Sequence, residues 1–123
     1  MLFYKLFYSI VESNILETNA TFSIKLNENH PIYKGHFPNS PITPGVVQLE
    51  IIKELIFITT NKDTSLVSIS NCKFLAILAP SDSQVKINID FNIDENNNLK
   101  VIAKIFNHEK VFFKLNAIYN QSN

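Results

Sequence analysis

The chain has 123 residues, of which 46% are hydrophobic and 18% charged. This is the size of one globular domain, and the composition excludes a disordered chain. Eleven lysines balance eleven acidic residues and arginine is absent, which excludes a strongly basic nucleic-acid binder and a bidentate guanidinium clamp. The only cysteine, Cys72, cannot form an internal disulfide, and no segment reaches membrane-spanning length, so we expect a cytoplasmic protein without a membrane span.

Two strands are predicted before the first helix. Residues 2–11 are apolar and aromatic, and residues 20–26 alternate with a period of two, which is typical of a strand with one buried face. The polar residues 12–19 between them predict a turn. Residues 27–43 are rich in proline and show no period, so we expect an irregular loop there.

A long buried helix follows this loop. Thr43 is a candidate N-cap, Pro44 suits the first helical position, and residues 46–58 are apolar around most of the circumference. The isoleucines would also suit a strand, but the length and the cap favour a helix. Polar residues 61–63 end it.

The remaining chain predicts about four strands, at residues 65–78, 84–93, 99–106 and 110–119. The asparagine run at residues 96–98 and a tight turn at Asn107-His108-Glu109 separate the last three. One helix that is apolar nearly all round needs a sheet wrapped about it. The expected fold is therefore a single α+β domain over residues 1–123, in which a curved antiparallel sheet of about six strands encloses one central helix.

The loop before the helix holds the first candidate for chemistry, His36. Pro38, Pro41 and Pro44 stiffen the backbone around it, and Gly35 leaves room for a ligand to approach. A histidine that titrates near neutrality is a natural proton carrier. A lone loop histidine is more often structural, so the loop alone leaves both interpretations open.

The helix offers a carboxyl. At about 100° per residue, Glu50, Lys53 and Glu54 share a sector with Val46 and Phe57. The charged residues indicate a solvated face, whereas the apolar ones favour a surface that lines a cleft or meets another chain. In the second case, partial desolvation and the neighbouring Glu54 would raise the pKa of Glu50, which could then act as an acid.

Gly45 is the third candidate. Its amide has no partner within the helix, and the absent side chain would let a substrate oxygen approach, so it could polarise a carbonyl. The alternative is that the glycine only relieves crowding beside Pro44. The other histidines, His30 and His108, are expected to be exposed, and with Cys72 they show no zinc spacing. No phosphate-binding glycine loop or nucleophile elbow is present in the sequence.

Together these residues resemble a known signature. Gly35-His36-Phe37-Pro38, Pro41, Pro44-Gly45-Val46 and Glu50 are similar to the signature of the FabZ-type 3-hydroxyacyl-[acyl-carrier-protein] dehydratases, which have the hot-dog fold. Cys72-Lys73-Phe74-Leu75, followed by Pro80 and Asp82, is similar to the strand that enters a Pro-Gly-Asp turn in that family.

The resemblance implies a hydro-lyase that converts a 3-hydroxyacyl thioester into a trans-2-enoyl thioester in fatty-acid or related lipid biosynthesis. It implies that His36 and Glu50 form the catalytic pair across a dimer interface, with Gly45, Phe37 and Val46 binding the substrate. No metal or other cofactor is implied. The implied partner is an acyl carrier protein, and the implied assembly is a homodimer, a trimer of dimers or a heterodimer with a related subunit.

Some positions depart from the family pattern. Asn39 and Ser81 stand where glycines are common, and Thr43 stands where an apolar residue is usual. Ile51, Lys53 and Glu54 replace the small residues and glutamine that usually follow the glutamate. These changes bear on the identity of the acyl substrate more than on the type of reaction.

Two alternatives remain at this point, a hot-dog acyl thioesterase and a non-catalytic acyl-binding subunit of a dehydratase complex. Lys34 and Lys73 lie in segments expected near the tunnel mouth. They could steer an acidic carrier protein or could be ordinary surface lysines.

Overall fold

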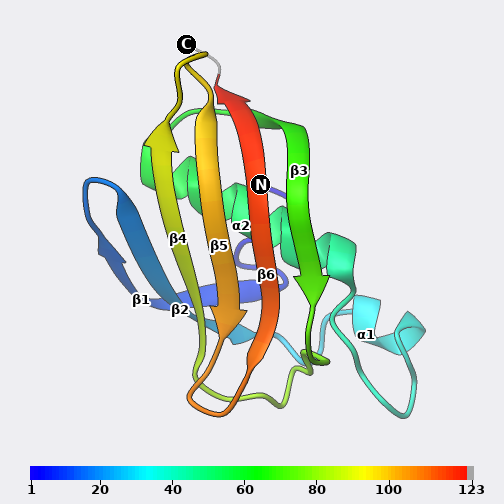
Figure 1. Ribbon diagram of the computed structural model, residues 1–123. Helices are drawn as coiled ribbons and strands as arrows, with labels where there is room; N and C mark the ends of the chain where they lie inside the picture. The colour runs from blue at the N-terminus through cyan, green and yellow to red at the C-terminus, as the bar shows by residue number, and fades with distance from the viewer. Residues whose placement is uncertain (122–123) are drawn as a thin grey trace.

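The computed structural model describes residues 1–121. Its strands and helices are β1 (Tyr8–Ile15), β2 (Asn19–Leu26), α1 (Ile32–Gly35), α2 (Gly45–Thr60), β3 (Thr64–Phe74), β4 (Val85–Ile93), β5 (Leu99–Phe106) and β6 (Val111–Gln121). The six strands form one antiparallel sheet in the order β1-β2-β4-β5-β6-β3. The sheet curves, and α2 lies behind it (Figure 1).

The core lies between α2 and the inward face of the sheet. Ile51, Ile52 and Leu55 of α2 have no exposed surface. Strand β5 shows the pattern that produces this core, because its side chains alternate strictly between buried and exposed positions from Leu99 to Ile105. A period of two places every second side chain on the same face. The predicted α+β arrangement of six strands around one long helix is confirmed.

The start of the chain differs from the prediction. Strand β1 begins at Tyr8 and continues to Ile15, so the expected strand at 2–11 and the expected turn at 12–19 are both displaced. The backbone N–H groups of Leu2, Phe3 and Tyr4 donate to the Glu54 carboxylate at 2.9 to 3.0 Å. These donors are therefore used by a side chain of α2 and not by a neighbouring strand.

The approach to α2 also differs. The helix begins at Gly45, and Pro44, not Thr43, holds the N-cap position. The Thr43 hydroxyl is instead hydrogen-bonded to the Tyr33 hydroxyl at 2.8 Å. Tyr33 belongs to α1, a short helix inside the segment expected to be irregular.

The later strands agree more closely with the predictions. Strand β5 has the predicted bounds, and Asn107 organises the β5–β6 turn by accepting hydrogen bonds from the N–H groups of Glu109 and Lys110. Strand β3 is shorter than predicted and ends at Phe74. The chain then crosses toward the start of α2, where the Leu78 carbonyl accepts from the Thr43 N–H at 2.8 Å. No helix among residues 1–121 is long and apolar enough to cross a membrane.

Candidate active site

His36 lies at the end of α1 on a loop braced by backbone hydrogen bonds. Its N–H donates to the Ile32 carbonyl at 3.1 Å, and its carbonyl accepts from the Ile42 N–H at 2.7 Å. Phe37 and Ser40 exchange two further backbone hydrogen bonds. The imidazole is exposed, and a Cβ added at Gly35 would meet nothing within 4 Å. The expected rigid loop with open space before the histidine is therefore present.

Thr43 connects this loop to the beginning of α2. Its side chain is 2% exposed, its hydroxyl is bonded to Tyr33, and its carbonyl accepts from Gln48 Nε2 at 3.1 Å. A threonine can occupy this buried position because its hydroxyl has a partner. The departure from an apolar residue thus has a local structural reason.

Gly45 opens α2 under an aromatic ring. A Cβ built on Gly45 would lie 2.6 Å from Cζ of Phe74, closer than real Cβ contacts allow. The Phe74 ring in turn stacks on Phe113, with ring centroids 4.6 Å apart. The glycine therefore lets the Phe74 ring lie directly against the start of α2, a reason that the sequence did not reveal, while its amide remains at the helix N-terminus.

Glu50 is half-buried on α2, one turn beyond Val46. It lines a cavity of about 170 Å³ together with Lys53, Leu66 and Tyr119. The Tyr119 hydroxyl is buried and has no hydrogen-bond partner within residues 1–121. Burial, and secondly the nearby Glu50 carboxylate, raise the pKa of Tyr119 to about 12.

Glu54 has a different role from Glu50. It is 3% exposed and accepts, besides the three backbone N–H groups, a hydrogen bond from the Tyr8 hydroxyl at 3.0 Å. Burial and the charge of Glu54 raise the pKa of Tyr8. Glu54 therefore differs from Glu50 and Lys53, with which it shares a sector of the helix, because its carboxylate faces inward and anchors the first residues of the chain.

Within one chain the predicted residues form two separate groups. Gly45 lines a cavity of about 380 Å³ with Gln48 and Phe74, and Glu50 lines the smaller one beside Tyr119. Among residues 1–121, no hydrogen bond or shared cavity joins His36 to Glu50. Phe37 and Val46, the other predicted substrate-binding residues, are 51% and 77% exposed.

The two lysines predicted to meet a carrier protein lie on different elements. Lys34 is exposed in the last turn of α1. Lys73 is exposed near the end of β3, on the outer face of the sheet, where it is paired with Lys114 of β6.

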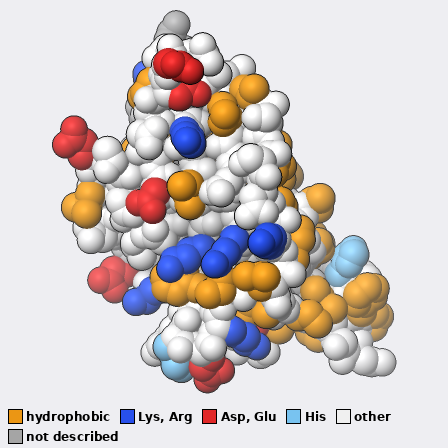
Figure 2. All heavy atoms as spheres, viewed as in Figure 1, with side chains coloured by type: hydrophobic (Ala, Val, Ile, Leu, Met, Phe, Trp, Pro, Cys, Tyr) orange, Lys and Arg blue, Asp and Glu red, His pale blue; other side chains and the backbone are white. Residues whose placement is uncertain are grey.

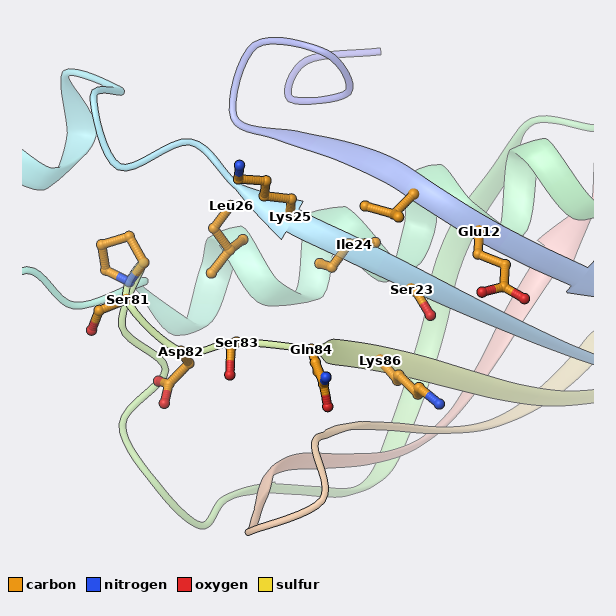
Figure 3. A pocket seen from close by; sticks show the side chains of 12 residues that line it. Glu12, Ser23, Ile24, Lys25, Leu26, Ser81, Asp82, Ser83, Gln84 and Lys86 are labelled. Carbon is orange, nitrogen blue, oxygen red and sulfur yellow. The ribbon is translucent and has the colours of Figure 1, made fainter.

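Another cavity lies away from all these residues. It measures about 620 Å³ and is bounded by β1, β2, the start of β4 and the loop before β4. Figure 3 shows Glu12 and Lys86 on strands along it, with Ser81 and Asp82 on the adjoining loop. Because it contains none of His36, Gly45 and Glu50, we do not place the reaction there.

Two buried polar residues near the predicted site were missed from the sequence. Gln48 is 3% exposed, and its Oε1 has no partner within the described residues although it lines the same cavity as Gly45. Tyr119 is 1% exposed beside Glu50. The available signals were a glutamine in an apolar helix segment and a tyrosine on the inward phase of β6.

The curved six-stranded sheet around one long helix is the hot-dog fold, which solved structures of similar shape share. The dehydratase heterocomplex ApeI:P from Xenorhabdus doucetiae has a TM-score of 0.68 at 19% identity, covering 91% of this chain and 96% of that chain. A sigma28-regulated virulence protein from Campylobacter jejuni has a TM-score of 0.69 at 14% identity, covering 96% of this chain and 85% of that chain.

Sequence comparison identifies the family within this fold. The profile described as ApeI-like, ApeI dehydratase, matches residues 12–114. This protein therefore belongs to the ApeI-like dehydratase family.

Curated relatives carry the name 3-hydroxyacyl-[acyl-carrier-protein] dehydratase FabZ. The protein from Rickettsia felis is 34% identical over 86 residues, which cover 60% of this chain and 59% of the relative. The protein from Rickettsia typhi is 40% identical over 63 residues, which cover 45% of this chain and 43% of the relative. The chain thus matches at most about three-fifths of the length of these relatives. The predicted resemblance to FabZ-type dehydratases is confirmed.

Proposed function

We propose that this protein is a hydro-lyase that removes water from a 3-hydroxyacyl thioester to give a trans-2-enoyl thioester. One observation carries this proposal. A braced loop presents the exposed His36 imidazole, while α2 holds the half-buried Glu50 carboxyl in a small cavity whose walls are mainly apolar but include Lys53. Elimination of water uses a base that accepts the proton from C2 and an acid that protonates the departing hydroxyl, and these two side chains can supply both.

The two groups would meet between two chains. Strand β3 is paired only with β6 and forms one edge of the sheet. Its side chains Leu66, Val67 and Ile69 are 41 to 53% exposed, and Val46 of α2 is 77% exposed. An apolar edge strand of this length invites pairing with another strand. A second copy across this edge would place Glu50 of one chain near His36 of the other.

The proposed reaction uses each group once. His36 accepts the proton from C2 of the 3-hydroxyacyl thioester, and the electron pair of that C–H bond forms the C2–C3 double bond. The C3–O bond breaks, and Glu50 donates its proton to the departing hydroxyl, so that water leaves. The Gly45 amide stabilises the negative charge that develops on the thioester oxygen. Return of the proton from His36 to Glu50 restores the starting state.

Phe37 and Val46 would contact the acyl chain, since both are apolar, exposed and adjacent to the proposed catalytic loop and helix start. We propose an acyl carrier protein as the donor of the chain, in line with the FabZ name of the curated relatives, and the cytoplasm as the place of the reaction. The Xenorhabdus dehydratase is a heterocomplex, so a related subunit is the second candidate for the partner across β3.

The test follows both possible products from one substrate. Purified protein is incubated with a 3-hydroxyacyl thioester, and enoyl formation and free thiol are measured together. We expect enoyl product without thiol release. Thiol alone would indicate a thioesterase, and neither product, despite demonstrated acyl binding, would indicate a non-catalytic subunit.

Two substitutions test the catalytic assignment. His36→Ala and Glu50→Gln should each lower kcat by about 100-fold or more, because each removes a proton-transfer group. His108→Ala and Glu17→Gln are matched controls at exposed positions on turns and should retain wild-type turnover. Wild-type rates in both His36→Ala and Glu50→Gln would show that the assignment is wrong.

A further inference from the structure

The outer face of the sheet carries a row of lysines across three adjacent strands. Lys73 of β3 is directly opposite Lys114 of β6, and Lys114 is directly opposite Lys104 of β5. All three side chains are exposed. Figure 2 shows lysine side chains running in a row across this face, beside a strip of apolar side chains.

This arrangement is unfavourable for the isolated chain. Like charges directly opposite each other on neighbouring strands destabilise a sheet. Within residues 1–121, none of the three lysines makes an ion pair. The Lys104 ammonium lies 4.6 Å from the centre of the Phe106 ring, a contact that leaves its charge uncompensated. An anionic group bound across the three lysines would relieve this repulsion.

The three lysines line a groove that also contains polar residues and one acidic residue. A groove of about 470 Å³ is lined by Lys73, Lys104 and Lys114, together with Asn88 and a single acid, Asp90. Asp90 accepts a hydrogen bond of 2.6 Å from Asn19. Three lysines against one carboxylate leave the groove positive.

An apolar strip borders the lysine row. One step further along the strands, half-buried Phe106 is paired with half-buried Val111 on one side and with exposed Lys86 on the other. A partner that fits this face therefore needs negative groups along one line and apolar groups along the next.

The spacing of the row matches an α-helix. Adjacent strands lie about 4.8 Å apart, so three cross-strand lysines repeat at about this distance. The pitch of an α-helix is about 5.4 Å. A helix lying across the strands with one carboxylate per turn would therefore meet each lysine in succession, while its neighbouring apolar face covers Phe106 and Val111.

We propose that Lys73, Lys104 and Lys114 dock an acidic amphipathic helix of the protein that delivers the acyl chain, an inference that rests on the proposed dehydratase function. The row begins one residue before Phe74, whose ring lies against Gly45. Lys73 and Phe74 point to opposite faces of the sheet, so an acyl chain delivered from the row would pass around the end of β3, which lies at Phe74, to reach the amide proposed to bind the thioester oxygen. Of the two lysines expected to meet the carrier, Lys73 belongs to this row and Lys34 does not.

The experiment compares two forms of one substrate. The same 3-hydroxyacyl group is presented on a phosphopantetheinylated acyl carrier protein and on N-acetylcysteamine, and the double variant Lys104→Glu/Lys114→Glu is assayed with both. We expect kcat/KM with the carrier-bound substrate to fall at least tenfold, mainly through KM, and to lose its dependence on salt. Turnover of the small thioester should stay within twofold.

The control is Lys100→Glu. Lys100 lies on the same strand and face as Lys104 and is exposed, but it is flanked by Asn92 and Ile118. Lys100→Glu should not change kcat/KM for either substrate. The docking proposal is overturned if the double variant uses carrier-bound substrate as well as wild type does, or if Lys100→Glu is equally impaired.

A second measurement separates docking from catalysis. If wild-type protein turns over neither substrate, the dehydratase proposal fails, and calorimetric titration with the carrier protein alone decides the docking. At least tenfold weaker binding by the double variant would support the lysine row, and unchanged or absent binding would refute it. Thermal unfolding of the double variant itself provides the folding control. One like-charged pair, between positions 104 and 114, is exchanged for another, and the pair between Lys73 and position 114 becomes attractive, so Tm should not fall.

Discussion

Glu54 illustrates how one carboxylate can organise a segment that is distant in sequence. It accepts hydrogen bonds from three backbone N–H groups near the start of the chain and from the Tyr8 hydroxyl. Hydrogen bonds to a charged acceptor are stronger than neutral ones. The N-terminal residues are therefore held against α2 by a single side chain.

Replacement of Glu54 by glutamine should destabilise the protein by about 3 kcal/mol, because a neutral amide accepts these hydrogen bonds more weakly. Urea unfolding measures this loss, and amide exchange should accelerate at Leu2, Phe3 and Tyr4. Glu95→Gln, at an exposed turn position, is the matched control. A change below about 0.5 kcal/mol in Glu54→Gln would contradict the anchoring role.

The sequence could not separate Glu54 from Glu50. Both carboxylates fall in one sector of the helix, one turn apart, and periodicity describes only the direction in which a side chain leaves the axis. The difference arises from the chain that covers that sector. The backbone N–H groups of Leu2, Phe3 and Tyr4, about fifty residues earlier in the chain, donate to the Glu54 carboxylate. Glu50, in contrast, lies beside a small cavity.

Among the elements, β3 forms one edge of the sheet and leaves nearly all of its side chains exposed in a single chain. It pairs with β6 on one side only, and its ladder contains two irregularities, between Leu66 and Ser68 and between Ile69 and Asn71. Bulges bend an edge strand. Its exposed apolar side chains remain available for contact with a second chain.

Substitution of Val67 by lysine should weaken the dimer that we propose across β3, because a buried charge at an apolar interface is costly. Sedimentation equilibrium should show at least a tenfold increase in the dimer dissociation constant. Ile93→Lys is the matched control, since Ile93 is 52% exposed and Val67 is 53% exposed. Equal effects of the two substitutions would argue against an interface at β3.

Local patterns predicted some elements well and others poorly. Strand β5 has the predicted bounds because its alternation is strict and asparagine turns flank it. Strand β1 was misplaced because the donors of residues 2–4 bind a side chain on α2, which no local period records. Likewise, α1 was missed because its Tyr33 hydroxyl is held by Thr43, ten residues later.

At the scale of the whole molecule, buried tyrosines make the stability of the fold depend on pH in the alkaline range. Burial raises the pKa of Tyr33 and of Tyr119 to about 12 each, and Tyr8 is shifted in the same direction. In the unfolded chain these groups ionise near pH 10. Their contribution to stability is therefore complete below pH 10 and is lost as the pH rises from 10 through 12.

The free energy of unfolding should fall by roughly 5 kcal/mol between pH 10 and pH 12 through Tyr33 and Tyr119 together. Urea unfolding at several pH values measures the slope. The double variant Tyr33→Phe/Tyr119→Phe should show a shallower decline, although loss of the Tyr33 bond to Thr43 lowers its starting stability. A decline as steep as that of wild type would contradict the assignment.

The sequence predicted the overall fold better than it predicted the assembled site. The alternating strands and the apolar helix specify one sheet around one helix, because burial of apolar faces follows from periodicity. It also singled out His36, Gly45 and Glu50. A single chain does not bring them together, since no hydrogen bond or shared cavity joins His36 to Glu50 within residues 1–121.

The contact between Gly45 and Phe74 restricts which replacements this family member can accept. A methyl group at position 45 would enter the Phe74 ring, and that ring is held in place by its stack on Phe113. A residue larger than glycine at position 45 therefore requires either that the Phe74 ring leave its stack on Phe113 or that a smaller residue stand at position 74. The two positions, twenty-nine residues apart in the chain, should therefore change together during evolution.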